Sequence, residues 1–103
     1  MFLKYFIADV QVSCLIDTGS TVCVIHPRKY DELPKSARPE IKSSTKRICL
    51  ADGSVIKTFG HVDLPIQIGT SITMQKFIIA EIDVPVVLGF DFLHRHRCTL
   101  DVH

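Results

Sequence analysis

The sequence predicts an all-β domain, a small closed or folded-over barrel, and three observations lead to that prediction. Residues Val10–Ile16 and Val62–Ile68 both alternate apolar and polar side chains with period two, as half-buried strands do. Asp52-Gly53 is a strong hairpin signal, because Asp-Gly tolerates the positive φ angles of a tight turn. Helical patterning is scarce, so the sheet must supply most of the fold.

The remaining elements follow in chain order. Pro65 cannot donate a ladder hydrogen bond, so its strand is expected at an edge or with a local irregularity. A turn at Gly69-Thr70-Ser71 leads into a strand that runs from Ile72 to Ile79. Two further segments are expected as short helices, and one as a polar surface loop; these are a turn from Pro27 through Leu33, a C-terminal helix over Phe90 to His96, and the loop Pro34 to Ser44.

Length and charge set the broad class of the protein. A chain of 103 residues suits a single domain spanning residues 1–103. The formal charge of +1 gives no electrostatic reason to expect nucleic acid or an anionic membrane as a partner. Apolar runs are only a few residues long, against about 20 needed to span a bilayer. Lys4 and Asp9 interrupt the apolar N-terminus, which therefore does not resemble a signal peptide.

The cysteines and histidines predict no metal site. Cys14, Cys23, Cys49 and Cys98 form no CxxC pair and have no zinc-like spacing. They are expected to be buried reduced thiols, which favours a cytoplasmic protein. His94 and His96 alternate on a predicted helix and are expected at its solvated basic end. No cofactor is expected.

The tetrapeptide Asp17-Thr18-Gly19-Ser20 is the main candidate for chemistry. It directly follows the apolar strand Cys14-Leu15-Ile16 and precedes a second expected strand, Val22–Ile25. All four residue types form turns, so a plain β-turn is the competing interpretation of this motif alone. A second motif, Val87-Leu88-Gly89 followed by Phe90-Asp91-Phe92-Leu93, lies far downstream.

The ordered set of motifs resembles the retropepsins, the aspartic proteases of retroviruses and LTR retrotransposons, and most closely those of the Ty3/gypsy type. In that family an apolar strand leads into Asp-Thr/Ser-Gly, a flap hairpin follows, and an apolar-apolar-Gly segment opens a short helix before a terminal strand. The corresponding parts here are Leu15 to Ser20, the flap Ala51-Asp52-Gly53-Ser54, the second loop at Leu88 and Gly89, and the terminal strand Cys98 to Val102. The resemblance implies an aspartic endopeptidase that cuts extended peptides or a retroelement polyprotein, in the cytoplasm or within a retroelement particle.

The chemistry explains why two chains are needed. Hydrolysis without a metal or a covalent nucleophile uses two close carboxylates that share one proton, one as base and one as acid. The sequence contains Asp-Thr-Gly once. Asp17 can therefore serve only if a second chain supplies the other aspartate across a twofold axis, which predicts a homodimer.

The neighbours of Asp17 have expected roles as well. Gly19 allows close backbone approach, and Ser20 is expected to donate a hydrogen bond to the Asp17 carboxylate. By resemblance, Thr18 bonds across the dimer. One departure from the family is Phe90, which occupies a position that is often charged, with Val22 where its acidic partner would stand, so that ion pair cannot form.

The termini are the expected dimer interface. Both ends of the chain look like strands, and by resemblance such strands from two chains interleave in one sheet. A lone terminal strand would otherwise leave an exposed edge. The predicted interface residues are Phe2, Leu3, Thr18, Cys98, Leu100 and Val102.

Two alternatives stay open at this level. One is a domesticated retropepsin fold that acts as a dimerisation or peptide-binding module. The other is a cellular retropepsin-like peptidase. The intact Asp17-Thr18-Gly19-Ser20 motif weighs against the first.

Overall fold

The protein is described by a computed structural model that covers residues 1–37, 41–42, 47–49 and 55–95. Most of the elements are strands. In chain order they are β1 (Phe2–Ile7), β2 (Val10–Ile16), β3 (Val24–Ile25), α1 (Pro27–Glu32), the 3₁₀ turn η1 (Lys35–Ala37), β4 (Arg47–Cys49), β5 (Val55–Ile68), β6 (Ser71–Ala80), β7 (Val86–Leu88) and α2 (Phe90–Arg95).

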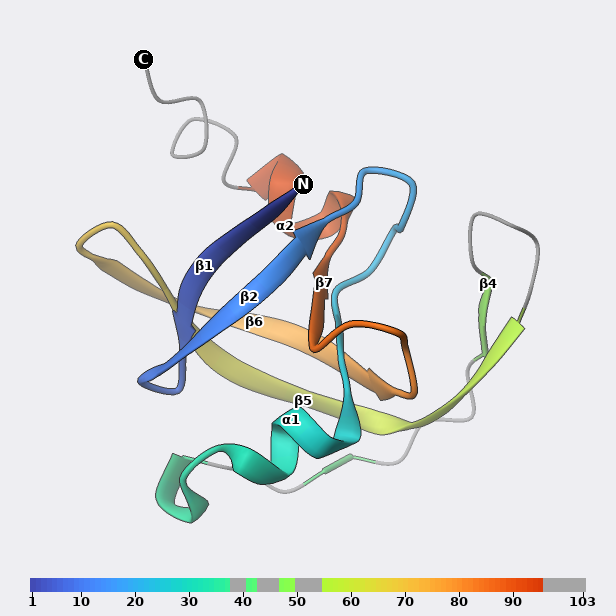
Figure 1. Cartoon of the computed structure of the whole chain (residues 1–103), viewed down its shortest axis with the longest axis horizontal. Helices are drawn as coiled ribbons and strands as arrows, with labels where there is room; N and C mark the ends of the chain where they lie inside the picture. Colours follow the sequence, from blue (N-terminus) through green and yellow to red (C-terminus); the bar gives the residue numbers. More distant parts are fainter. Residues whose placement is uncertain (38–40, 43–46, 50–54, 96–103) are drawn as a thin grey trace.

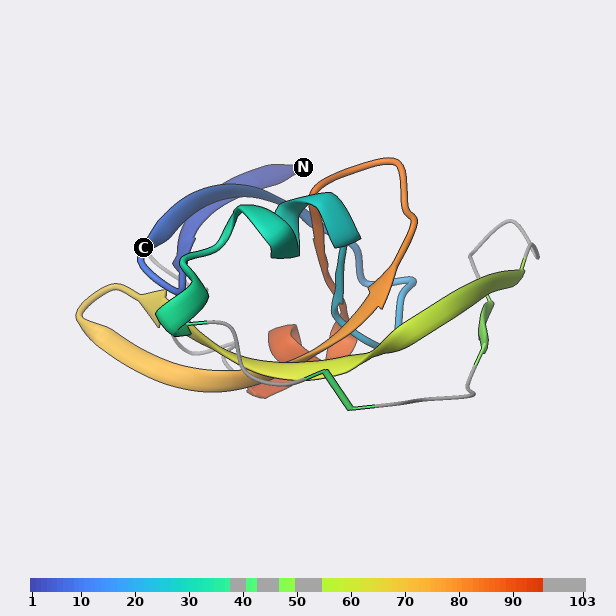
Figure 2. The ribbon, with the colours of Figure 1, turned by 90° about the horizontal axis from the view of Figure 1, so that it is seen from below.

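The strands form one mixed sheet that closes on itself, as the sequence predicted (Figure 1). The strand order is β1-β2-β7-β3-β6-β5-β4, and an additional pairing of β1 with β5 joins the two sides. Every strand except β4 therefore lies in a closed ring. Figure 2 shows the β1–β2 and β5–β6 hairpins as two layers, with the far end of β5 reaching beyond the body beside β4.

The first hairpin has a two-residue turn at Ala8 and Asp9. Its register runs from Phe2 opposite Leu15 to Ile7 opposite Val10. Both turn residues have positive φ, 50° and 67°, as a type I′ turn requires. This backbone twist matches that of the flanking strands, so the hairpin curls smoothly into the barrel.

The second hairpin joins β5 and β6 through the predicted turn. Ile68 lies opposite Ser71, and Gly69 has a φ of 60°. The register is continuous through Pro65, and the irregularity falls instead between Thr58 and Gly60. Pro65 has no N–H to donate, but its nitrogen and its carbonyl both point away from β6, so no bond of the β5–β6 ladder is lost. The carbonyl accepts a 2.9 Å hydrogen bond from Ala8 N in the turn after β1.

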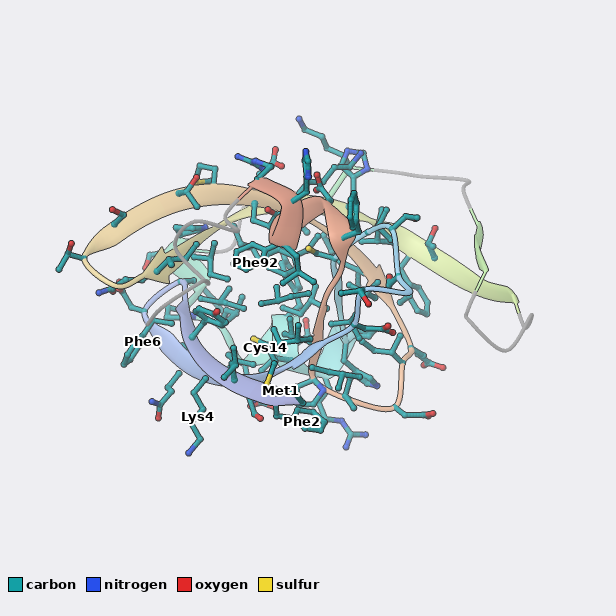
Figure 3. The ribbon with its side chains drawn as sticks, turned by 90° about the horizontal axis from the view of Figure 1, so that it is seen from above. Met1, Phe2, Lys4, Phe6, Cys14 and Phe92 are labelled. Carbon is teal, nitrogen blue, oxygen red and sulfur yellow. The ribbon has the colours of Figure 1, made fainter. Side chains whose placement is uncertain are left out.

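The main core lies between the two layers. Phe92 of α2 is fully buried and points into this core toward the side of Cys14, whereas Phe2, Lys4 and Phe6 on β1 point away from the body (Figure 3). Tyr5 meets the Phe92 ring edge to face, with centroids 5.8 Å apart. The short helix α2 is thus stabilised mainly by tertiary packing, since a helix of this length is marginal on its own.

The predicted helical turn at Pro27 is confirmed as α1, and His26 caps it by accepting a hydrogen bond from Arg28 N. Two other local predictions need correction. The expected loop after Pro34 begins with the 3₁₀ turn η1. The expected strand Val22–Ile25 is paired only at Val24 and Ile25, because Val22 belongs to the turn described below.

No helix within the part of the chain that the structure describes is long and apolar enough to cross a membrane.

Candidate active site

Two neighbouring parallel strands place the two predicted motifs at one edge of the sheet. β2 and β7 pair in parallel, with Leu15 opposite Val87 and Ile16 opposite Leu88. Asp17 follows β2 and Gly89 follows β7, so both loops leave the same edge. The structure therefore brings together Asp17 and Leu88-Gly89, as expected, although they lie far apart in the sequence.

The backbone holds the Asp17 carboxylate in a tight turn. Asp17 N donates to Leu88 O at 3.1 Å, which fixes the start of the loop to β7. Gly19 N donates to Asp17 Oδ1 at 2.9 Å, and Ser20 N donates to Asp17 O at 3.2 Å. This is the Asx turn that the turn-forming residues permit. Because Asp17 is only half-buried, its carboxylate remains accessible at the surface of the chain.

The second loop presses directly on the first. Phe90 N, the first amide of α2, donates to Ser20 O at 2.7 Å. A Cβ at Gly89 would lie 2.7 Å from Ser20 O and closer still to Val22 O. Gly89 is thus required by close backbone approach and not by an unusual φ. Its role is to let α2 dock against the Asp17 turn.

The predicted hydrogen bond from Ser20 to the Asp17 carboxylate is wrong. Ser20 Oγ donates to Val22 O at 2.8 Å. The carboxylate is turned toward Gly19 N, and the hydroxyl closes the next part of the turn instead. Ser20 therefore stabilises the loop, and its predicted direct effect on Asp17 is withdrawn. Thr18 is exposed, so its expected bond to a second chain stays a prediction.

Apolar side chains pack together on the sheet face beside Asp17, and most of them are buried. Strand alternation places Leu15, Val87, Val24 and Ile78 on the face opposite the main core, in register across β2, β7, β3 and β6. These residues form a second apolar cluster, which also contains Ala80 and the partly buried residues Val22, Ile82 and Val84. The cluster includes Val22, the position where an acid was noted as missing.

The predicted flap falls outside the described residues. Its four residues, Ala51, Asp52, Gly53 and Ser54, are among those for which no structure is given. The strands on either side, β4 and β5, pair antiparallel, with Cys49 opposite Val55 and Arg47 opposite Lys57. That is the pairing which a hairpin needs, and the flap itself stays a prediction.

The predicted interface residues have mixed outcomes. Phe2 and Leu3 are exposed by 53% and 38%, but their strand is not a lone one. β1 pairs with β2 along its whole length and with β5 at Phe6 and Ile7, so its N-terminal half has one open edge. Cys98, Leu100 and Val102 fall outside the described residues. The interface itself stays a prediction.

Cys14 and Cys23 are free, buried thiols. Burial, with a smaller contribution from the nearby Cys23, raises the pKa of Cys14 to about 12. Burial likewise raises the pKa of Cys23 to about 11, although backbone hydrogen bonds from Gly89 and Phe92 oppose the shift. Thiols that stay protonated at neutral pH are poor nucleophiles and poor metal ligands.

One buried polar side chain was not anticipated. Gln75 on β6 is fully buried, and its amide nitrogen donates to Asp91 Oδ2 on α2 at 3.0 Å. Within the sequence it looks like an ordinary polar residue of a half-exposed strand. No local signal distinguishes it, because the partners that satisfy it come from a helix near the C-terminus.

Other polar features show no role in catalysis. His94 is exposed and stacks on Phe90, with ring centroids 5.3 Å apart. Among the described residues no three His, Cys, Asp or Glu side chains converge as metal ligands would. A pocket of about 300 Å³ lies between α1 and the β6–β7 connection, and its lining includes His26, Arg28 and Asp83 but not Asp17.

Comparison with known proteins identifies the family. The family model for gag-polyprotein putative aspartyl proteases matches residues 3–95. A protease of EIAV, solved with the inhibitor HBY-793, superposes with a TM-score of 0.80 at 23% identity, over 92% of this chain and 86% of that one. The retroviral protease-like domain of Ddi1 from Leishmania major gives 0.71 at 16% identity, over 94% and 77% of the two chains. A retropepsin-like aspartic protease from Rickettsia conorii gives 0.66 at 15%, over 91% and 70%. The chain therefore belongs to the gag-polyprotein aspartyl protease family and is an aspartic endopeptidase of the retropepsin type.

Proposed function

We propose that this chain is one subunit of a homodimeric peptidase in which the Asp17 carboxylates of two subunits activate one water. The substrate is an extended peptide segment with apolar side chains beside the scissile bond, within a retroelement polyprotein. The family description, which names the gag polyprotein, supports that choice of substrate.

The proposal rests on the position and exposure of the Asp17 carboxylate. Within the described residues, its carboxylate accepts one hydrogen bond, from Gly19 N, and is left half-exposed at the edge of the sheet. The sequence contains Asp-Thr-Gly once. A two-carboxylate mechanism therefore needs a second copy of this loop, and a twofold axis beside the exposed Thr18 would supply it.

The chemistry then follows from a pair that carries one shared proton. The ionised aspartate takes a proton from the water as the water oxygen attacks the peptide carbonyl carbon. The protonated aspartate gives its proton to the carbonyl oxygen, which produces a neutral tetrahedral intermediate. Collapse of that intermediate breaks the C–N bond, and the leaving nitrogen takes the proton that the first aspartate had acquired. The second aspartate recovers a proton from a hydroxyl of the intermediate, which forms the carboxylic acid product and restores the pair with its one shared proton. No metal or cofactor is needed at any step.

The second apolar cluster supports the preference for apolar substrate side chains. Leu15 and Val22 are partly buried residues that flank the Asp17 turn on either side in the sequence, and Val87 lies opposite Leu15 on β7. Apolar side chains that pack on such a surface gain about 25 cal/mol per Å² of area removed from water. A charged residue at these substrate positions would lose that gain and its own hydration.

The test is cleavage of a peptide library between pH 4 and 7, with Asp17→Asn as the inactive variant. The matched control is Asp63→Asn, the same chemical change at an exposed position on β5. We expect Asp17→Asn to lose activity beyond detection, and Asp63→Asn to keep it. Cleavage by Asp17→Asn above a few per cent of wild type would refute the assignment of Asp17.

A dilution series tests the dimer separately. Turnover per chain should fall as the protein is diluted, and sedimentation should show monomers over the same concentration range. A chain that stays active as a monomer at every concentration would overturn the shared-site mechanism.

A further inference from the structure

We propose that Gln75 is a positioning residue for catalysis, which fixes the orientation of α2 and, through α2, the Asp17 turn. The inference rests on the proposed role of Asp17 and goes beyond it, because Gln75 lies on β6 and belongs to neither active-site motif.

Both the nitrogen and the oxygen of the Gln75 side-chain amide have hydrogen-bond partners, and the residue is 0% exposed. Its Nε2 donates to Asp91 Oδ2 at 3.0 Å and to Lys76 O at 3.0 Å, and its Oε1 accepts from Arg95 Nη1 at 3.4 Å. A buried amide left without partners would be costly, so these bonds hold one specific arrangement of β6 against both ends of α2.

Directional bonds matter here because the apolar anchor of α2 is not directional. Phe92 fixes the depth of the helix through its fully buried ring, which meets Tyr5. Hydrophobic contact of this kind does not set the rotation of a one-turn helix about its buried residue. Asp91 and Arg95 stand on either side of Phe92 in the sequence, and both are tied to Gln75.

The orientation of α2 is transmitted directly to the active site. Phe90 N donates to Ser20 O at 2.7 Å, and Gly89 lies against the backbone of Ser20 and Val22. A rotation of α2 must therefore either break the bond to Ser20 or carry the loop with it. Displacements of this kind, below about 1 Å, can lower kcat by 10- to 100-fold in a site that depends on alignment.

Four variants test the inference. Gln75→Leu keeps the approximate volume and removes the amide. Asp91→Ala removes the partner of Gln75 on α2 at an exposed position. Asp91→Asn keeps an oxygen that accepts the Gln75 proton and serves as the conservative rescue. Gln67→Leu is the matched control, since Gln67 on β5 donates only to Gly69 O in the hairpin turn at 3.1 Å.

Two measurements are made on each variant. Turnover is measured at protein concentrations that saturate dimer formation, so that kcat and KM can be separated. Amide hydrogen exchange is measured in an Asp17→Asn background, which prevents self-cleavage. The reporter is the amide of Phe90. The internal reference is the amide of Ala8, which donates to Pro65 O at 2.9 Å in the turn between β1 and β2 and shares no residue with α2 or the Asp17 turn.

We expect Gln75→Leu and Asp91→Ala to lower kcat about tenfold or more with KM within about threefold. Both should increase Phe90 exchange about tenfold relative to Ala8. Asp91→Asn and Gln67→Leu should stay within about twofold of wild type in both readouts. A general loss of stability would increase exchange at both amides together, so the ratio separates positioning from a merely structural role.

Any other pattern overturns the inference. Lower kcat with an unchanged Phe90-to-Ala8 exchange ratio means that the loop is not held through α2. A changed ratio with full kcat means that catalysis does not need the hydrogen bonds of Gln75. If the wild-type chain lacks turnover, or Asp17→Asn retains it, the proposed role of Asp17 fails instead. The exchange ratio then decides by itself whether Gln75 holds the loop.

Discussion

Gly89→Ala should separate catalytic geometry from stability more cleanly than any other single change. The new Cβ would meet Ser20 O at 2.7 Å and Val22 O even closer, whereas ordinary contact begins at 3.4 Å. The loop or α2 must therefore move by roughly 0.7 Å or more, because packed backbone cannot yield like a flexible side chain. Such overpacking typically costs about 1–3 kcal/mol of unfolding free energy.

The effect on turnover should be larger than the effect on folding. The atoms that must retreat are the carbonyls of the turn that begins with Asp17, so a displacement of this size should lower kcat on the order of 10- to 100-fold. Gly69→Ala is the matched control. It places a Cβ in open space at a φ of 60°, so it costs about 1 kcal/mol of backbone strain far from the active site.

Peptide turnover and urea unfolding should be measured on both variants. We expect both to lose stability to a comparable degree, and only Gly89→Ala to lose turnover. If Gly89→Ala keeps kcat within about threefold of Gly69→Ala, then close approach of α2 does not set the geometry of the Asp17 turn, and the reasoning fails.

Three other predictions follow from single contacts. Ser20→Ala removes a hydroxyl that binds Val22 O, so both limbs of the pH–rate profile should keep their positions; a displaced limb would mean that the hydroxyl acts on the catalytic carboxylate. His26→Ala should lower the unfolding free energy by about 1 kcal/mol in urea, because it removes the cap of α1, and His26→Asn should retain most of it. The raised pKa values of Cys14 and Cys23 mean that the unfolded thiols ionise above pH 9 while the folded ones stay protonated. The unfolding free energy should therefore fall from pH 9 to 11 by up to about 1.4 kcal/mol per pH unit for each thiol, and replacement of both by alanine should remove that slope.

The strands were predictable where a local pattern determines them. Alternation in Val10–Ile16 predicts β2 with its full length, and Gly69-Thr70 predicts the β5–β6 turn. These features depend on side-chain period and on turn residues, both of which act over a few positions. For the same reason the Asp17 turn was predictable in place.

Features that depend on distant partners were not predictable. On β6 the apolar residues Ile72 and Met74 are exposed by 65% and 54%, whereas the polar Gln75 is buried. This is the reverse of the usual pattern, in which apolar side chains are buried and polar ones are exposed. The inversion is stable because Asp91 supplies a partner from α2. Ser20 was assigned to the wrong acceptor for a related reason, since both acceptors lie within reach of one turn and only the docked conformation of that turn selects between them.

The Asp17 turn is formed by consecutive residues, but distant parts of the chain stabilise it. Of the backbone bonds that hold it, one comes from within the turn, to Asp17 O, and two join it to β7 and α2, at Leu88 O and from Phe90 N. Residues near the end of the described chain must therefore dock before Asp17 reaches its final geometry. A growing or truncated chain that lacks β7 and α2 can form the β1–β2 hairpin, whose contacts are sequential, but its aspartate has no fixed orientation. In the proposed homodimer, pairing would therefore act on a loop that β7 and α2 have already shaped, so the proposed shared site would require the closed barrel.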